Sequence, residues 1–212
     1  MIRIFEIMNV TSRNVILSAV EGAFKRSFIL FLVLIFNSCN GDNVPDCFQN
    51  AGDLVRVPID VPEFSTMTVF ENVKVVLKQG DEQLVEIETG EYLLNDVSVV
   101  VEDGRLILRN ENSCNYVREY GLTTVYVTSP NITEIRSSTG LPITSNGMLD
   151  YPSISLISES YTNPDTETTD GSFDLQMSSS TVNIVVNGIA YFKLRGKTNN
   201  FNVTVAAGDS RI

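Results

Sequence analysis

Short runs of alternating apolar and polar residues, separated by polar turns, fill the chain beyond residue 50. Alternation with a period of two in β-branched and aromatic residues is typical of strands that bury one face. The clearest runs are TMTVF (66–70), VKVVLKQ (73–79), LVEIET (84–89), VSVVVE (97–102), RLILRN (105–110) and TVYVT (124–128). No stretch after residue 39 offers a convincing helical face. The pattern therefore predicts an all-β domain.

Strand starts in the second half recur at a nearly fixed spacing. One series begins at Ile132, Ile154, Phe173 and Phe192, with steps of 22, 19 and 19 residues, and a second pairs Val182 with Phe201, again 19 apart. A repeat of about 20 residues has the length of one coil of a β-solenoid, in which successive coils stack their apolar residues. This spacing favours a solenoid for residues 120–212.

A β-sandwich is the alternative fold. Asp103-Gly104 and Asn187-Gly188 each stand between two apolar runs, and both dipeptides are strong signals for two-residue hairpins. With either fold we expect an antiparallel hairpin at Asp103-Gly104. The polar segment 161–171 interrupts the repeat and is predicted to be a loop. The chain ends at Ile212, just after a strand and without a polar capping element, so we expect either a truncated C-terminus or an exposed last coil.

The N-terminal pattern is different and predicts export. Lys25 and Arg26 precede a nine-residue apolar run, Phe28 to Phe36, and the small residue Ser38 then leads into Cys39. This is the layout of a signal peptide, and nine apolar residues are fewer than half of the roughly 20 that span a bilayer. The end of the run resembles a lipobox, in which the cysteine is acylated. We therefore expect lipidation at Cys39; the alternatives are an ordinary signal peptide with an incidental cysteine and an uncleaved short anchor.

These patterns divide the chain into three parts. Residues 1–38 are predicted to be a lipoprotein signal peptide, 39–50 a tether, and 51–212 one β-domain, which is long enough for a single core. Removal of residues 1–38 takes away four cations and two acids, so the net charge changes from −11 to −13. Such a domain does not attract phosphate backbones, which excludes nucleic acid as a partner.

The chain contains no histidine, which excludes several enzyme classes. Without an imidazole it cannot build a Ser-His-Asp or Cys-His nucleophile, or the usual zinc site with histidine ligands. Chemistry that uses carboxylates alone, as in glycosidases or calcium-dependent lyases, stays open.

Several segments resemble a known family. The strand after DCFQ (46–49), then VPEFSTMTVFENVKVVLKQGDEQLVEIETG (61–90), VEDGRLILRN (101–110) and VYVTSPNITEIRSSTG (125–140), are similar to the head GIN domain, the putative adhesin family of Bacteroidetes lipoproteins. The resemblance covers roughly residues 47–212. It implies a right-handed parallel β-helix on an exported lipoprotein, with no established biochemical activity.

Each group of candidate site residues also has a structural explanation. Asp165, Glu167 and Asp170 cluster as acids do in calcium loops, but their spacing does not wrap one ion, and a solvated loop explains them equally well. Asp150, Lys193 and Arg195 match the residue types of a polysaccharide lyase by fold analogy alone. Four tyrosines have rings that can stack on sugars, although packing is the commoner use of strand tyrosines: Tyr116, Tyr120, Tyr126 and Tyr151. We therefore assign no catalytic, cofactor or metal residues.

The two other cysteines of an exported chain face an oxidising compartment. With Cys39 acylated, a single bridge between Cys47 and Cys114 uses both remaining cysteines; the alternative is two free buried thiols.

Together these inferences predict a non-enzymatic lipoprotein of the outer membrane or cell surface. A location on the periplasmic face of the membrane is an alternative. The lipoprotein is held to the membrane by a lipid anchor and binds a polysaccharide or an envelope protein. The rival prediction is a β-helix carbohydrate-active enzyme such as a polysaccharide lyase.

Overall fold

A computed structural model describes residues 46–212 except 71, 113, 115, 117 and 160–170. Two 3₁₀ helices and thirteen strands follow one another in this order: η1 (Asp46–Phe48), β1 (Leu54–Ile59), β2 (Thr66–Val69), β3 (Lys74–Gln79), β4 (Leu84–Gly90), η2 (Glu91–Asp96), β5 (Val97–Glu102), β6 (Arg105–Asn110), β7 (Thr124–Ser129), β8 (Glu134–Ser137), β9 (Pro142–Leu149), β10 (Ser153–Glu159), β11 (Gly171–Asn187), β12 (Ala190–Ala207) and β13 (Ser210–Arg211). The all-β prediction is confirmed.

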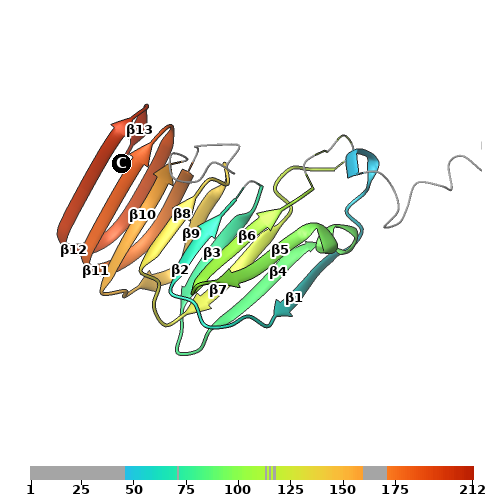
Figure 1. Cartoon of the computed structure of the whole chain (residues 1–212), viewed down its shortest axis with the longest axis horizontal. Coiled ribbons are helices and arrows are strands. Elements are labelled where there is room, and N and C mark those ends of the chain that lie inside the picture. Colours follow the sequence, from blue (N-terminus) through green and yellow to red (C-terminus); the bar gives the residue numbers. More distant parts are fainter. Residues whose placement is uncertain (1–45, 71, 113, 115, 117, 160–170) are drawn as a thin grey trace, which may run out of the picture. The chain divides into compact units, whose positions relative to one another are not determined.

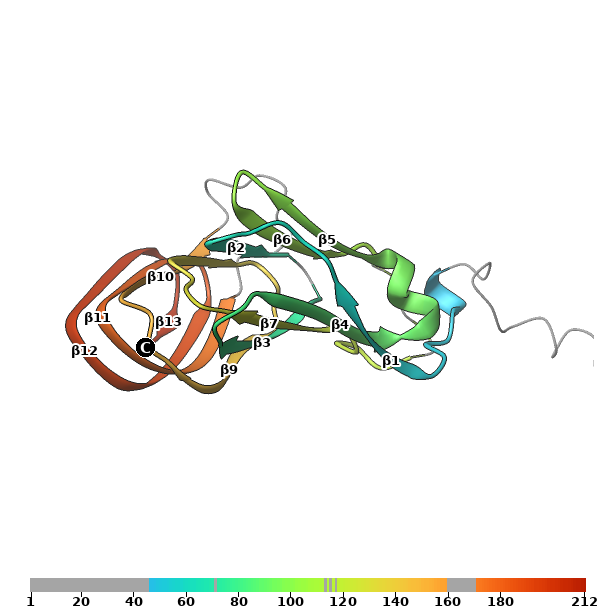
Figure 2. The same ribbon diagram turned by 90° about the horizontal axis from the view of Figure 1, so that it is seen from below.

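All thirteen strands belong to one mixed sheet (Figure 1). Its order is β1-β4-β7-β3-β9-β11-β10-β8-β2-β6-β5, and β12 and β13 follow on the far side of β11. Pairs β1–β4, β4–β7 and β5–β6 are antiparallel, whereas the other neighbours are parallel. The sheet curls around its core until it is nearly closed (Figure 2).

Strand β11 makes this curl possible because its two halves have different neighbours. Residues Ser172–Met177 pair with β9, while Thr181–Asn187 pair with β10. The strand bends between these halves, and β12 follows it in parallel along almost its whole length. Figure 2 shows both strands bending around the interior.

The prediction of a right-handed parallel β-helix is wrong. The 19-residue spacing does give the true register where β12 lies on β11, with Phe173 opposite Phe192 and Val182 opposite Phe201. Elsewhere the neighbours are not successive coils: β2 lies between β6 and β8, and β3 lies between β7 and β9. Three antiparallel pairs also break the pattern of a parallel solenoid. The β-sandwich alternative fails too, because the strands form one continuous sheet.

The two hairpin signals have different outcomes. Asp103 and Gly104 have φ values of 49° and 75°, and they join β5 to β6 in the predicted antiparallel hairpin. Positive φ at both central residues is the requirement of a type I′ turn. Asn187-Gly188, in contrast, joins β11 to β12, which are parallel. Because both strands bend around the interior (Figure 2), the chain returns to the start of β11 and β12 then runs parallel to it, so no hairpin forms.

The inward positions of the alternating runs form the core. Fully buried side chains include Met67, Leu77, Leu106, Ile135 and Ile143. Each comes from a different strand, so one core connects the walls of the curled sheet. Within the described residues, no helix combines the length and the apolar content needed to cross a bilayer.

Candidate functional site: an aromatic surface beside the disulfide

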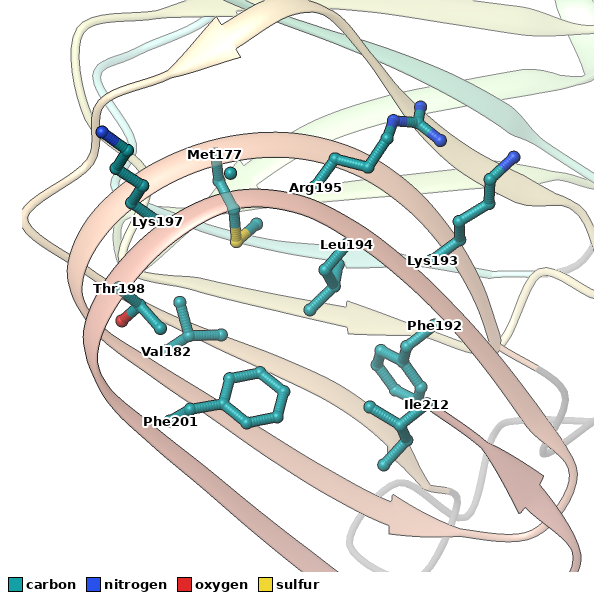
Figure 3. Close-up of a pocket in the computed structure, with 11 residues that line it drawn as sticks. Met177, Val182, Phe192, Lys193, Leu194, Arg195, Lys197, Thr198, Phe201 and Ile212 are labelled. Carbon is teal, nitrogen blue, oxygen red and sulfur yellow. The ribbon is translucent and has the colours of Figure 1, made fainter.

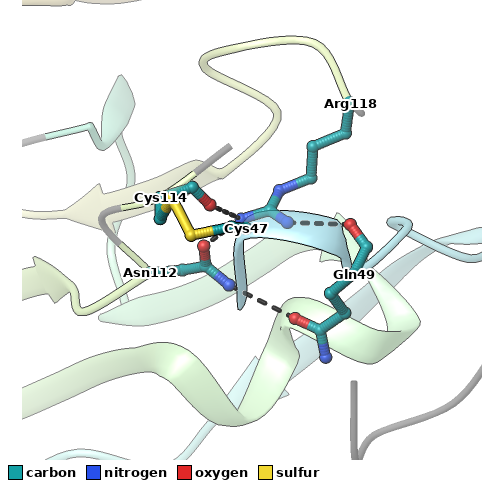
Figure 4. Close-up of a disulfide and its surroundings, with 5 residues drawn as sticks. All are labelled: Cys47, Gln49, Asn112, Cys114 and Arg118. Atoms are coloured by element: carbon teal, nitrogen blue, oxygen red, sulfur yellow. Dashed lines mark hydrogen bonds between the residues drawn. A yellow bond between two sulfur atoms is a disulfide. The ribbon is translucent and has the colours of Figure 1, made fainter. Parts of the chain in front are cut away.

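A disulfide bond joins Cys47 to Cys114, as the cysteine count predicted. The S–S distance is 2.03 Å and the Cα atoms are 4.5 Å apart. The bridge ties η1 to the segment that follows β6 (Figure 4). The backbone N–H of Tyr116 adds a second link, since it donates to the carbonyl oxygen of Cys47 at 2.9 Å.

A hydrogen-bond network holds this junction in place (Figure 4). The Arg118 guanidinium donates to the carbonyl oxygens of Gln49 and Cys114, at 2.8 and 3.0 Å, and to Oδ1 of Asn112. Asn112 in turn donates from Nδ2 to Oε1 of Gln49, at 3.3 Å, and to Oδ2 of Asp96, at 2.9 Å. Gln49 and Asn112 are buried. Satisfied buried networks of this kind fix the backbone that carries them.

Three large aromatic side chains are exposed on the two segments that the disulfide joins. The exposed fractions are 56% for Phe48, 75% for Tyr116 and 74% for Tyr120. The rings of Phe48 and Tyr116 contact each other, with centroids 5.8 Å apart. We call these three residues the aromatic surface. Contiguous exposed apolar groups, such as the contacting rings of Phe48 and Tyr116, mark interaction sites more often than single exposed apolar residues do.

A cavity beside the segment that contains Asn112, Arg118 and Tyr120 is too small for a sugar. Its volume is about 30 Å³, and Asn72, Asn110, Asn112, Arg118 and Tyr120 contribute to its wall. That is room for about one water molecule. A sugar therefore does not fit inside this cavity.

The two other candidate tyrosines are not available to a ligand. Tyr151 is fully buried, and burial raises its pKa to about 12. Tyr126 lies under the guanidinium of Arg56, 3.7 Å from the ring centroid, and its hydroxyl donates to Glu88 at 3.0 Å. Partial burial and this hydrogen bond raise the pKa of Tyr126. Both rings have structural partners, as the packing explanation predicted.

The residues considered for a lyase, Asp150, Lys193 and Arg195, do not contact one another in the way that the lyase hypothesis requires; each has another partner. Nζ of Lys193 lies 3.4 Å from Asp174, and the Arg195 guanidinium donates to the same carboxylate at 2.6 Å. Asp150 donates its backbone N–H to the side chain of Gln79. The two cations are thus neutralised in part by Asp174, which the sequence analysis did not consider.

Some predictions fall outside the described residues. These are the signal peptide (1–38), the first part of the tether (39–50), lipidation at Cys39, and most of the loop 161–171 with its acids Asp165, Glu167 and Asp170. In the part of the chain that the structure describes, no three His, Cys, Asp or Glu side chains gather closely enough to hold a metal ion.

Sequence reasoning named Tyr116 and Tyr120 but missed Phe48 and Arg118. One signal could have found Phe48: an aromatic residue follows each of the bridged cysteines within two positions. A disulfide brings such neighbours together. Arg118 gave no comparable signal, because its partners are mostly backbone carbonyl groups and a buried amide.

The fold and the junction define an all-β protein with exposed aromatic residues beside a disulfide. Residues 63–212 match the family described as "Putative auto-transporter adhesin, head GIN domain", so the chain belongs to this family. No curated protein matches its sequence.

The comparison with solved structures found matches from several bacteria. A putative adhesin from Parabacteroides merdae is 14% identical, with a TM-score of 0.45 and coverage of 75% of this chain and 80% of that one. A putative adhesin from Parabacteroides distasonis is 18% identical, with a TM-score of 0.42 and coverage of 75% and 67%. A putative cell adhesion protein from Clostridium sporogenes is 15% identical, with a TM-score of 0.41 and coverage of 76% and 99%.

Proposed function

We propose that the protein is a non-enzymatic adhesin of the cell envelope that binds polysaccharide through its aromatic surface. The observation that carries this proposal is the exposure of Phe48, Tyr116 and Tyr120 on a junction fixed by a disulfide. Membership of an adhesin family gives the same direction.

The chemistry of the surface suits a sugar chain. The apolar C–H faces of a pyranose ring stack on aromatic rings, and a tyrosine adds a hydroxyl that exchanges hydrogen bonds with sugar hydroxyl groups. Tyrosine also offers a large contact area at a low cost in conformational entropy. The ring pair of Phe48 and Tyr116 is already formed, with centroids 5.8 Å apart, which lowers the ordering cost of binding.

A glycan-array screen of the full chain tests this proposal. We expect retention on a subset of polysaccharides, and the double variant Tyr116→Ala/Tyr120→Ala should bind them at least tenfold more weakly. Tyr191→Ala is the matched control, because Tyr191 is 51% exposed on β12, at the opposite end of the sheet (Figure 1). Equal loss of binding in the two variants, or no retained glycan, would contradict the proposal.

We also propose that a lipid on Cys39 anchors the protein at the outer membrane or cell surface. The support is the short apolar run Phe28 to Phe36 that ends just before Ser38 and Cys39. Each buried methylene of an acyl chain contributes about 0.8 kcal/mol, so stable anchoring takes more than one chain.

Substitution of the cysteine tests the anchor. Cys39→Ser should leave the protein unprocessed or release it from the membrane fraction, as gel mobility and fractionation will report. Wild-type mobility together with wild-type membrane association of the variant would refute lipidation at this residue. Protease treatment of intact cells then separates a surface location from a periplasmic one.

A further inference from the structure

Four neighbouring strands, β3, β9, β11 and β12, form one wall of the sheet. Along their register one row of residues is buried in the core: Val75, Ile143, Phe173 and Phe192. Successive side chains of a strand point to opposite faces of the sheet. The next row therefore points outwards: Val76, Thr144, Asp174 and Lys193.

The outer face of this wall carries four cations. Lys74 and Lys78 lie on β3, and Lys193 and Arg195 lie on β12. Figure 3 shows the head groups of Lys193 and Arg195 turned away from the apolar side chains. Asp174 is the one acid in β3, in β9 and in the parts of β11 and β12 that lie beside them. We call these four cations the cationic face.

The cationic face keeps an excess of positive charge. Nζ of Lys193 lies 3.4 Å from Asp174, and Arg195 donates to the same carboxylate at 2.6 Å, so one acid serves two cations. Lys74 and Lys78 form no ion pair with any described residue. Four cations and one acid leave an excess of three positive charges on a chain whose net charge is −11.

Acids border this face. Glu86 on β4 binds Arg56 at 2.6 Å, and Glu88 accepts from the hydroxyl of Tyr126 at 3.0 Å. Further exposed acids follow the ends of β3 and β9 or precede Tyr120: Asp81, Glu82, Asp150 and Glu119. At physiological ionic strength, charges more than about 8 Å apart are largely screened. The net charge of the chain therefore does not decide what binds in contact with the cationic face.

Lys74 connects the cationic face to the aromatic surface. A Cβ added at Gly121 would lie 3.2 Å from Cε of Lys74 and 3.4 Å from its Nζ, so this side chain lies against Gly121. Gly121 directly follows Tyr120, whose exposed ring belongs to the aromatic surface. A ligand that extends past Tyr120 therefore reaches the ammonium group of Lys74.

We propose that the polysaccharide bound by this protein is acidic, with its anionic groups on the cationic face and sugar rings on the aromatic surface. This inference rests on the proposed function and names its substrate class. Charge-assisted hydrogen bonds are roughly twice as strong as neutral ones. The cationic face spans three strand spacings, roughly 14 Å, which gives room for more than one sugar unit. Its continuity with exposed rings favours a sugar chain over a lipid surface, because sugars stack on such rings.

Matched polymers separate the effect of charge from that of the sugar. Polygalacturonate carries carboxylates, and its methyl ester keeps the backbone without the charge; dextran sulfate and dextran form the second pair. Isothermal titration calorimetry of the full chain measures the four affinities. We expect at least one acidic polymer to bind at least tenfold more tightly than its neutral counterpart. Equal affinities within both pairs, or no binding of either acidic polymer up to about 1 mM in sugar units, overturns the proposal.

Paired substitutions separate the cationic face from the net charge. Lys78→Gln/Lys193→Gln removes two of the three excess charges and should weaken binding of the acidic polymer at least tenfold. Asn200→Asp/Asn202→Asp changes the net charge by the same amount at exposed residues of β12 beyond its bend, and it should keep the affinity. Equal weakening in the two variants would show that net charge controls binding and would refute the proposal. Circular dichroism checks that both variants are folded.

The proposed function and this inference fail in different ways. A glycan array that retains neutral glycans alone supports the proposed function and overturns the inference. Binding that is lost in the lysine variant but kept in Tyr116→Ala/Tyr120→Ala contradicts the aromatic site and supports the cationic face. Phosphatidylglycerol vesicles that bind through Lys78 and Lys193, without binding of either acidic polymer, would identify a membrane surface as the partner. Tyr191→Ala keeps all four cations and stays the control for the aromatic surface.

Discussion

Asn112 connects three segments of the chain through one buried side chain. It accepts from Arg118 and donates to Gln49 and Asp96. Removal of one partner from a buried network leaves the others unsatisfied, at a cost of about 1 to 3 kcal/mol. The rigidity of the aromatic surface therefore depends on a residue that a ligand on its outer side need not touch.

Asn112→Ala should lower the free energy of unfolding by about 1 to 3 kcal/mol, because Gln49, Asp96 and Arg118 lose their shared partner. Urea denaturation followed by circular dichroism measures the change. Asn202→Ala is the control: its side chain is exposed and donates to Asn183 at 2.9 Å, so the expected change is within about 0.5 kcal/mol. Similar losses in the two variants would argue against the network.

Tyr151 gives a prediction about pH. Burial raises its pKa to about 12, whereas an unfolded tyrosine ionises near pH 10. The neutral phenol is favoured in the folded state, so its contribution is complete below about pH 10 and is lost as the pH rises towards 12. The loss amounts to about 2 to 3 kcal/mol.

Urea denaturation between pH 9 and pH 12 checks this dependence. Tyr151→Phe has no ionisable group at this site and should show a flatter stability curve over the same range. Absorbance titration of the phenols gives a second readout, since the variant should lack a late-ionising tyrosine. A variant with the wild-type slope would show that other groups cause the loss.

At the scale of elements, two glycines are needed for different reasons. One allows a positive φ in a turn, and the other also allows two strands to approach closely. Gly104 has φ +75° in the β5–β6 turn, and an added Cβ would meet nothing within 4 Å. Gly196 in β12 has φ +140°, and an added Cβ would lie 1.7 Å from the carbonyl oxygen of Met177 on β11. Only the second substitution forces two strands apart.

Gly196→Ala should therefore cost more than Gly104→Ala. We expect about 1 kcal/mol for Gly104→Ala, from strain alone, and about 3 kcal/mol or more for Gly196→Ala. The midpoints of urea denaturation give both values. If the two costs prove equal, the close contact between β11 and β12 is not rigid.

The sequence pattern predicts where most strands lie, but it does not predict the order of the strands in the sheet. Alternation located the strands, Asp103-Gly104 located a hairpin, and the 19-residue spacing gave the register of Phe173 on Phe192. The order of the strands escaped because pairing between distant segments leaves no local signal. Thr66 of β2, for example, lies opposite both Arg105 of β6 and Glu134 of β8, and nothing near residue 66 indicates either partner.

The candidate site also was predictable from the sequence only in part. Alternation does not distinguish Tyr151, which is buried, from Tyr116, which is exposed, since neither lies in a regular strand. The disulfide was predictable because exported cysteines have few other uses. The ring contact between Phe48 and Tyr116 depends on that bridge and on the exact path of the backbone, which only the fold determines.

At the scale of the whole molecule, the disulfide links stability to binding. It closes a loop between cysteines that are 67 positions apart, for which the chain-entropy estimate is about 4 kcal/mol. Domains of this size have free energies of unfolding of about 5 to 15 kcal/mol. One covalent bond therefore accounts for a large share of the stability, and it also holds Phe48 next to Tyr116.

Cys47→Ser/Cys114→Ser should lower the free energy of unfolding by about 4 kcal/mol. The variant should also bind glycans more weakly than the intact protein at temperatures where both are folded, because η1 is no longer tied to the segment with Tyr116. Thermal denaturation and the glycan array measure these two effects. Cys39→Ser is the control, since it removes a cysteine without touching the bridge, and it should keep both stability and glycan binding. A folded double variant with undiminished glycan binding would show that the bridge stabilises the domain but does not organise the aromatic surface.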